Sequence, residues 1–322
     1  MLNLTVIVPT YRRPNDLARC LRALQQQTQS FTEVIVVVRD EDADTWAMLE
    51  TLKALSLPLK TVTVTVAGVI AAMNTGVGAA TGDIVTFTDD DAAPHPDWLQ
   101  RIEAHFLADD RVGGVGGRDI IQRTEPWFEG ERATVGLLQW HGRLIGEHHR
   151  GIGAAREVDV LKGVNMSFRR SLFVDLQFDQ RLRGTGAQVH FEVAFCLALR
   201  RKGWTLIYDP AILVDHYIAQ RFDEDQRENF NDVAFANAVH NETLALLEHL
   251  SPLRQLIFWG WALAIGTTQA FGLVQWLRYL PSQGSLATAR WLASIQGRWQ
   301  GWQTWRQQGD RPSSGLTQTI HE

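Results

Sequence analysis

The sequence predicts an α/β fold, with a mainly parallel sheet that carries helices on both faces and a helical extension at the carboxyl end. Two observations predict the sheet: roughly the first hundred residues alternate β-branched runs with helix-like stretches, and polar residues follow directly after those runs. A third observation sets the end of the chain apart, because seven of the twelve tryptophans lie after Pro252. The 322 residues are 45% hydrophobic and 21% charged, which is typical of a folded enzyme.

The first elements are predicted in order along the chain. Strands are expected over residues 4–8, 34–38, 61–66 and 84–88. Asn15 is expected to cap a first helix, whose apolar face consists of Leu17, Leu21 and Leu24. Further helices are expected over residues 46–55 and 69–80.

The next block, residues 113–217, contains more glycine and turn residues. Within it, strands are expected over residues 158–161 and 206–208. This block is expected to close the far side of a ligand cleft.

Composition excludes some partners and compartments. The formal net charge is −5 and no basic cluster is present, so nucleic acid is not an expected partner. Cys20 and Cys196 lie in helix-like apolar patterns without metal or disulfide spacing, which indicates core thiols in a reducing compartment. Residues 1–9 enter a strand without the features of a secretory signal, which indicates a cytosolic amino-terminal part.

Polar residues at the strand ends are the candidates for chemistry, because ligands of open α/β sheets bind beyond the carboxyl ends of the strands. These residues are Pro9, Thr10, Tyr11, Arg12, Arg39, Asp40, Asp89, Asp90 and Asp91. The three consecutive aspartates would repel one another unless a cation neutralised them, and Mg²⁺ or Mn²⁺ would also bind the phosphates of a nucleotide diphosphate. The alternative is a solvated acidic turn or a helix N-cap, because Pro94 and Asp97 indicate a helix start nearby.

Three blocks in a fixed order carry a family resemblance: VIVPTYRR at residues 6–13, NTG at 74–76 and TGDIVTFTDDD at 81–91. Together they resemble glycosyltransferase family 2, whose members have the GT-A fold, a Rossmann-like sheet. The resemblance implies Asp91 as a metal ligand, Asp89 as a contact to the metal or the ribose, and Mn²⁺ or Mg²⁺ as the cofactor. It also implies that the donor, a nucleotide diphosphate sugar, contacts these residues: Pro9, Thr10, Tyr11, Arg12 and Asp90.

The resemblance covers roughly residues 4–216 and implies a catalytic domain over residues 1–220. Its nucleotide-sugar half would be residues 1–112 and its acceptor half residues 113–220. Residues 221–322 would then form the helical extension.

The base-binding side departs from the family pattern. Asn74 is expected near the nucleotide, or else as an amide on a helix surface, and the preceding residue is Met73 where the family usually carries arginine. Asp40 or Asp42 could meet the base, but the pattern there differs too, so the base is not identified.

On the acceptor side, Lys162–Arg170 resembles the segment that lines the cleft, and Asn165 is the candidate contact or else a turn asparagine. The family commonly has Glu-Asp where this chain has Phe191-Glu192, so the resemblance implies Glu192 as the catalytic base. The alternative is that Glu192 only stabilises the start of a helix through its dipole.

Two histidines are further candidate site residues. His216 matches a histidine that reaches the diphosphate or the metal in some relatives. His190 is expected to share the acceptor site.

The extension predicts membrane association. No charged residue occurs between Arg254 and Arg278, so residues 255–277 could form a helix of about 34 Å, just long enough for a bilayer core, or a buried helix covering the catalytic domain. After Pro252 there are six arginines against Asp310 and Glu322. Tryptophans at helical spacing accompany them, which favours a basic foot on anionic lipid at the cytoplasmic face.

These features predict an inverting glycosyltransferase that acts on a lipid-linked or cell-surface glycan precursor. One alternative is a sugar-1-phosphate nucleotidyltransferase, although such enzymes use a glycine-rich loop after the first strand and residues 8–12 contain no glycine. Another is a non-catalytic nucleotide-sugar or membrane-binding protein, which the departures at Met73 and Phe191 would permit.

Overall fold

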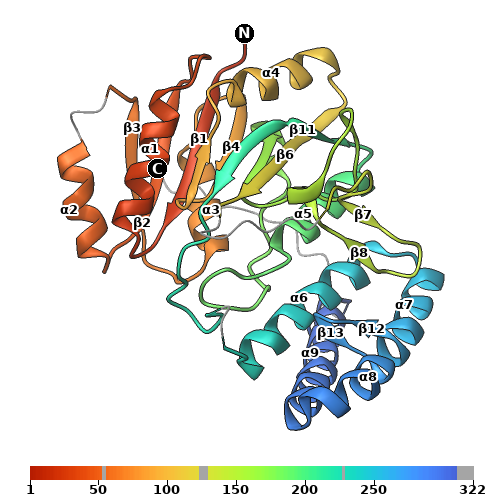
Figure 1. Cartoon of the computed structure of the whole chain (residues 1–322). Helices are drawn as coiled ribbons and strands as arrows, with labels where there is room; N and C mark the ends of the chain where they lie inside the picture. Colours follow the sequence, from red (N-terminus) through yellow and green to blue (C-terminus); the bar gives the residue numbers. More distant parts are fainter. Residues whose placement is uncertain (53–55, 123–129, 227–228, 310–322) are drawn as a thin grey trace, which may run out of the picture.

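The computed structural model describes residues 1–52, 56–122, 130–226 and 229–309, where one large sheet is covered by helices and further helices lie beside it (Figure 1). The sheet has the order β3-β2-β1-β4-β10-β6-β11-β5, and β9 pairs with β11. Its strands are β1 Leu4–Thr10, β2 Glu33–Arg39, β3 Leu59–Val64, β4 Ile84–Thr88, β5 Ala92–Pro94, β6 Val112–Ile121, β9 Arg156–Glu157, β10 Asn165–Arg169 and β11 Thr205–His216. Two small hairpins join β7 Leu137–Leu138 with β8 Leu144–Ile145, and β12 Gly266–Thr267 with β13 Ala270–Phe271.

The helices alternate with the strands in the first half of the chain and predominate at its end. The α-helices are α1 Pro14–Gln25, α2 Ala43–Thr51, α3 Val69–Ala79, α4 Trp98–Ala108, α5 Phe191–Arg201, α6 Asp232–His249, α7 Pro252–Ala264, α8 Leu273–Gln283 and α9 Ser285–Gly309. Two short 3-10 helices are η2 His148–Arg150 and η3 Arg170–Val174.

The predicted parallel sheet is confirmed in its first half, where β3, β2, β1 and β4 run parallel. Beyond it the sheet is mixed, because β10 is antiparallel to both β4 and β6, whereas β6 and β11 are parallel. Since β1 and β4 are parallel neighbours, their carboxyl ends meet at the same edge. The polar residues that follow them are therefore brought together.

Helices cover both faces of the sheet, as the sequence predicts. Side chains alternate along β1: Val6 and Val8 pack with α1 residues such as Leu17 on one face, and Ile7 packs with α3 residues such as Ile70 on the other. The hydrophobic core on the α1 face also includes residues of α2 and α4, and the core on the α3 face includes residues of α5 and α6. Each aliphatic side chain that is fully buried in these cores contributes about 1.5–3 kcal/mol.

Some predicted boundaries were wrong, for local reasons. The first helix begins at Pro14 and its N-cap position is Arg13, not Asn15, because proline suits the first helical position. The second helix begins at Ala43 since Asp42 caps it, and residues 53–55 lie outside the described residues. Residues 158–161 are mostly buried but are not a strand, because the backbone N–H of Val158 donates to Leu206 and those of the next two residues donate to the loop at Gly136.

The extension contains the expected helices, but residues 255–277 do not form one helix. The chain turns back after α7 through the β12–β13 hairpin, where Gly266 has a φ of 67° and a side chain at Gly272 would collide with the backbone of Ile265. Within the described residues, none of the helices combines the length and the apolarity needed to cross a membrane.

Candidate active site

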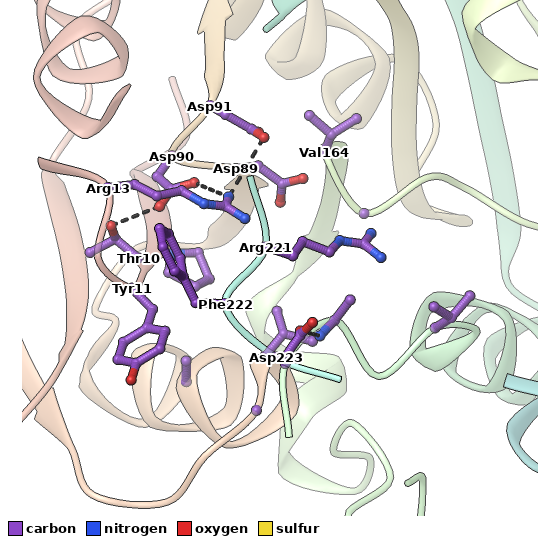
Figure 2. Close-up of a pocket in the computed structure, with 18 of the residues that line it drawn as sticks. Thr10, Tyr11, Arg13, Asp89, Asp90, Asp91, Val164, Arg221, Phe222 and Asp223 are labelled. Carbon is purple, nitrogen blue, oxygen red and sulfur yellow. Dashed lines mark hydrogen bonds and ion pairs between the residues drawn. The ribbon is translucent and has the colours of Figure 1, made fainter. Parts of the chain in front are cut away.

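A cavity of about 580 Å³ opens at the carboxyl ends of β1 and β4, a size suited to a small-molecule ligand (Figure 2). Many predicted site residues line it: Pro9, Thr10, Tyr11, Asp89, Asp90, Asp91, Glu192 and His216. Residues 218 and 221–223, just past β11, also line it, so the wall runs beyond the expected end of the catalytic domain at residue 220.

Asp90 holds the end of β1 against the end of β4. Its Oδ2 accepts a hydrogen bond from Oγ1 of Thr10 at 2.7 Å, and its Oδ1 pairs with Nη1 of Arg13 at 2.8 Å (Figure 2). Asp90 is buried, which raises its pKa, although Arg13 opposes that shift. Arg13, not Arg12, therefore brings its charge to the cavity; sequence analysis chose the neighbour because both occur in the same block.

Asp89, Asp91 and His216 form a group suited to a divalent cation, since one ligand atom from each lies within 4.8 Å of the others. Oδ1 of Asp91 and Nε2 of His216 are 3.4 Å apart. Both atoms are buried, and neither has a hydrogen bond of good geometry within the described residues. The carboxylate oxygens suit both Mn²⁺ and Mg²⁺, and the imidazole nitrogen suits the transition metal Mn²⁺ better than Mg²⁺, so the residues present fit the predicted cofactor.

The pKa values of the three residues in this group are shifted in different directions. Burial lowers the pKa of His216, but its hydrogen bond to Asp119 and the negative charge of nearby Asp91 outweigh burial and raise that pKa to about 9. Burial would raise the pKa of Asp91, yet its contacts with His216 hold it well below its usual value. Burial and the neighbouring Asp91 raise the pKa of Asp89. The carboxylates thus attract a positive charge.

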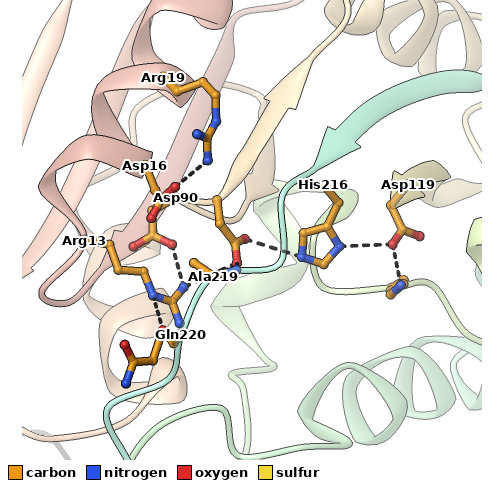
Figure 3. A network of polar contacts seen from close by, with 10 residues as sticks. Arg13, Asp16, Arg19, Asp90, Asp119, His216, Ala219 and Gln220 are labelled. Carbon is orange, nitrogen blue, oxygen red and sulfur yellow. Dashed lines mark hydrogen bonds and ion pairs between the residues drawn. The ribbon is translucent and has the colours of Figure 1, made fainter. Parts of the chain in front are cut away.

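Asp119 on β6 orients His216, and no local pattern in the sequence indicates this role. This buried carboxylate accepts from Nδ1 of His216 at 3.2 Å and from Nζ of Lys162 at 2.5 Å (Figure 3). Burial opposes ionisation, but these two partners lower the pKa of Asp119 to about 2. A carboxylate that binds one imidazole nitrogen fixes the ring, so that Nε2 faces Asp91.

Glu192 lies in the first turn of α5 and lines the same cavity. Its Oε2 is buried without a hydrogen-bond partner in the described part of the chain, and burial raises its pKa. A buried, unpaired carboxylate oxygen is unfavourable for folding, which is typical of a group retained for chemistry.

Beside the carboxyl ends of β1 and β2, Tyr11 and Arg39 line the cavity and interact with each other. The guanidinium of Arg39 lies 4.9 Å from the ring centre of Tyr11, and both side chains bond to Glu41. Of the predicted base contacts, Asp40 is exposed and outside the cavity lining, and Asp42 is buried as the cap of α2. Arg39 was among the strand-end candidates, but the family resemblance assigned it no role.

Four further predicted contacts lie outside the cavity lining: Asn74, Asn165, His190 and Arg12. Asn74 exchanges two hydrogen bonds with the backbone of Phe178, and Asn165 is buried, accepting from Nε1 of Trp98. The Asn74 amide therefore holds the loop at Phe178, whereas the Asn165 amide bonds to α4 and to the neighbouring strands β6 and β11. Asn165 sits on a strand instead of a turn. His190 occupies the N-cap position of α5 with a φ of 75°. Arg12 is outside the lining as well; its backbone N–H donates to Asp42.

The extension supports one wall of the cavity. Asn241 on α6 is buried, accepts from the backbone N–H of Arg183 at 2.7 Å, and donates to the carbonyls of Arg183 and Val189. Within this loop a Cβ at Gly186 would lie 1.2 Å from Oδ2 of Asp223, so only glycine permits this approach. Sequence analysis missed Asn241, because its partners are more than fifty residues away.

Comparison with known proteins identifies the class of enzyme as one that transfers sugars. A model described as "Glycosyl transferase family 2" matches residues 5–202. The chain therefore belongs to glycosyltransferase family 2.

Its relatives share limited identity. One is a glucosyl-dolichyl phosphate glucuronosyltransferase of Haloferax volcanii, 24% identical over 67% of this chain and 69% of the relative. Another is a pre-mycofactocin glycosyltransferase of Mycobacterium tuberculosis, 29% identical over 46% of this chain and 30% of the relative. The chain thus spans most of the first relative but under a third of the second.

Two solved structures share the fold. S. aureus TarS 1-349 in complex with UDP-GlcNAc has a TM-score of 0.57 at 15% identity, covering 95% of this chain and 92% of that one. The mannosyltransferase PcManGT from Pyrobaculum calidifontis, in complex with GDP-Man and Mn²⁺, has a TM-score of 0.56 at 18% identity, covering 94% and 84%. These likenesses bear out the predicted GT-A fold.

Proposed function

We propose that this chain is a metal-dependent inverting glycosyltransferase. It transfers a sugar from a nucleotide diphosphate sugar to a hydroxyl of a lipid-linked or cell-surface glycan precursor, at the cytoplasmic face of a membrane. One observation carries the proposal: a cation-binding group of Asp89, Asp91 and His216 lines the same cavity as the unpaired carboxylate of Glu192.

In the proposed reaction Glu192 accepts the proton of the acceptor hydroxyl. The hydroxyl oxygen bonds to the anomeric carbon as that carbon's bond to the diphosphate oxygen breaks, with inversion at the sugar. Asp89, Asp91 and His216 would hold Mn²⁺ or Mg²⁺, which when bound neutralises charge on the departing diphosphate. Arg13 and Arg221, which both line the cavity, add positive charge beside the carboxylates.

Two similarities support the donor and acceptor classes. The solved neighbours carry UDP-GlcNAc or GDP-Man, which supports a nucleotide-sugar donor. A relative named for a glucosyl-dolichyl phosphate substrate supports a lipid-linked acceptor.

The experiment is a screen of nucleotide sugars with and without Mn²⁺, measuring thermal stabilisation and release of the nucleotide diphosphate. We expect one donor to stabilise the chain only with the metal and to be slowly hydrolysed. Stabilisation without any turnover, even when glucosyl-dolichyl phosphate and other glycosylated polyprenyl phosphates are added as acceptors, would instead favour a non-catalytic binding protein.

A further inference from the structure

The β7–β8 hairpin of the catalytic domain is fixed to helix α7 of the extension (Figure 1). Nε of Arg254 donates to the carbonyl of Trp140 at the hairpin tip, at 3.0 Å, and Nη2 donates to the carbonyl of Gln139 at 3.0 Å. The ring centres of His141 and Trp261 lie 4.9 Å apart. The tip and the helix therefore present one continuous surface.

That surface exposes large apolar side chains. Trp140 at the tip is 66% exposed, and Leu253 and Leu256 on α7 are 69% and 70% exposed. The opposite side of α7 packs against the rest of the protein, because Phe258 and Ala262 are buried in the core. The core-facing side of α7 is therefore already packed, and its exposed leucines are not needed for folding.

Helix α8 continues the same pattern. Leu273, Val274 and Leu277 are 44–53% exposed and fall on one stripe of the helix, and α8 contacts α7 through the β12–β13 hairpin. We call the hairpin tip and these two stripes the docking face, with these residues: Trp140, Leu253, Leu256, Leu263, Leu273, Val274 and Leu277.

The charge of this region is of one sign. Residues 252–309 contain five arginines and no lysine, aspartate or glutamate, and residues 137–146 contain Arg143 and no acidic residue. Arg143 and Arg278 are exposed, whereas Arg298 is buried against Glu242. An apolar face with tryptophan and exposed arginine is complementary to anionic lipid, where the apolar groups enter the headgroup boundary.

We propose that the docking face binds the surface of an anionic bilayer, lying in its headgroup region. The inference rests on the membrane location proposed above, but not on sugar transfer itself. It changes the expected anchor, because Trp140 belongs to the catalytic domain. The tail and the catalytic domain would contact the lipid together, which would hold the cavity in a fixed orientation to the membrane.

The test is flotation of the full chain with vesicles of phosphatidylcholine alone or mixed with phosphatidylglycerol. We expect binding to the mixed vesicles, and at least a tenfold lower partition coefficient for the double variant Leu256→Glu/Leu277→Glu, because two carboxylates would enter the headgroup boundary. Trp140→Ala is expected to lower it roughly threefold or more. Leu107→Glu, on an exposed apolar residue of α4 at the other end of the molecule, is the matched control and should bind as wild type.

Unchanged vesicle binding by the double variant, or no binding by the wild type, would overturn the proposal. So would a wild-type dimer in light scattering that the double variant converts to a monomer without any vesicle binding, since the face would then belong to a second copy. Thermal stabilisation by UDP-GlcNAc or GDP-mannose with Mn²⁺, measured without lipid, should be equal in all variants. That readout verifies folding and separates failure of the docking face from failure of the proposed enzyme.

Discussion

Two regions of this chain concentrate charge of one sign, and they are built differently. At the end of β4, Asp89, Asp90 and Asp91 are consecutive, and the last two are buried. In α7–α9, exposed arginines such as Arg278 and Arg306 are far apart in sequence and face solvent. Like charges packed in a buried site need a defined partner of opposite charge, whereas charges spread over a surface attract a partner diffusely and are screened by salt.

The buried region already contains some of the positive charge that balances its aspartates. Arg13 neutralises Asp90, and His216 with Asp119 behind it balances Asp91. Asp89 forms no ion pair with any of the described residues, and burial together with Asp91 raises its pKa. The comparison therefore predicts large, local effects of substitution in the cavity and smaller, additive ones on the helices.

The largest effect is expected for Glu192→Gln. Loss of a general base lowers kcat by about 10²–10⁴-fold, and because glutamine keeps the shape of the side chain, donor binding should be unchanged. Measured transfer rates and donor-induced thermal stabilisation check this. Normal transfer by the variant would show that another group takes the proton.

Next in size is Asp91→Asn. Replacing a carboxylate by an amide should weaken Mn²⁺-dependent donor binding by roughly 100-fold, since the cation loses a charged ligand. Titration of the donor at fixed Mn²⁺ measures this. Asp83→Asn, an exposed aspartate one strand length earlier, is the control and should bind the donor normally.

A third prediction concerns the connection between the two regions. Asn241→Ala should lower the free energy of unfolding by about 2 kcal/mol, because three half-buried backbone groups of Arg183 and Val189 lose their partner. It should also slow transfer, since that loop forms a cavity wall. Asn231→Ala, the cap of the same helix, should cost about 1 kcal/mol without slowing transfer. Equal transfer rates in the two variants would show that the contacts of Asn241 with the cavity wall do not affect catalysis.

The pH dependence of stability gives a smaller effect. Burial raises the folded pKa of Glu192 above its unfolded value, so this group lowers stability as the pH rises through the interval between the two. Glu192→Gln should therefore raise Tm by a few degrees above that interval and leave it unchanged where the carboxyl is protonated in both states. A lower Tm of the variant at neutral pH would contradict this sign.

The smallest effect is expected from salt. Raising ionic strength should weaken binding to anionic vesicles several-fold, because exposed arginines are screened, while donor binding in the enclosed cavity changes little. Flotation and donor titration at two salt concentrations provide the comparison. Equal salt sensitivity of both would mean that the two regions do not differ as described.

Much of the fold was predictable because β-branched runs and their polar ends are local features. The strands β1, β2 and β4 and the exposed carboxyl edge follow from such runs. The gathering of Asp89, Asp91 and His216 followed from a family resemblance, since these residues are too far apart in sequence for any local pattern to join them.

What could not be predicted depends on tertiary contacts. Asp119 and Asn241 bond to partners 43 or more residues away, and no sequence spacing predicts contacts between residues so far apart. The helix expected over residues 255–277 is divided by a hairpin, because hydropathy alone does not reveal where Gly266 and Gly272 turn the chain. Asn74 and Asn165 resembled ligand contacts, but their amides bond to the protein itself.

The most direct test of the account is calorimetric titration of the full chain with UDP-GlcNAc and GDP-mannose, with Mn²⁺ or with a chelator. The account predicts that at least one donor binds the wild type only when Mn²⁺ is present, and that Asp91→Asn abolishes this difference. Donor binding of equal strength with the chelator, unchanged by Asp91→Asn, would contradict the central claim that these acidic residues hold the donor through a cation.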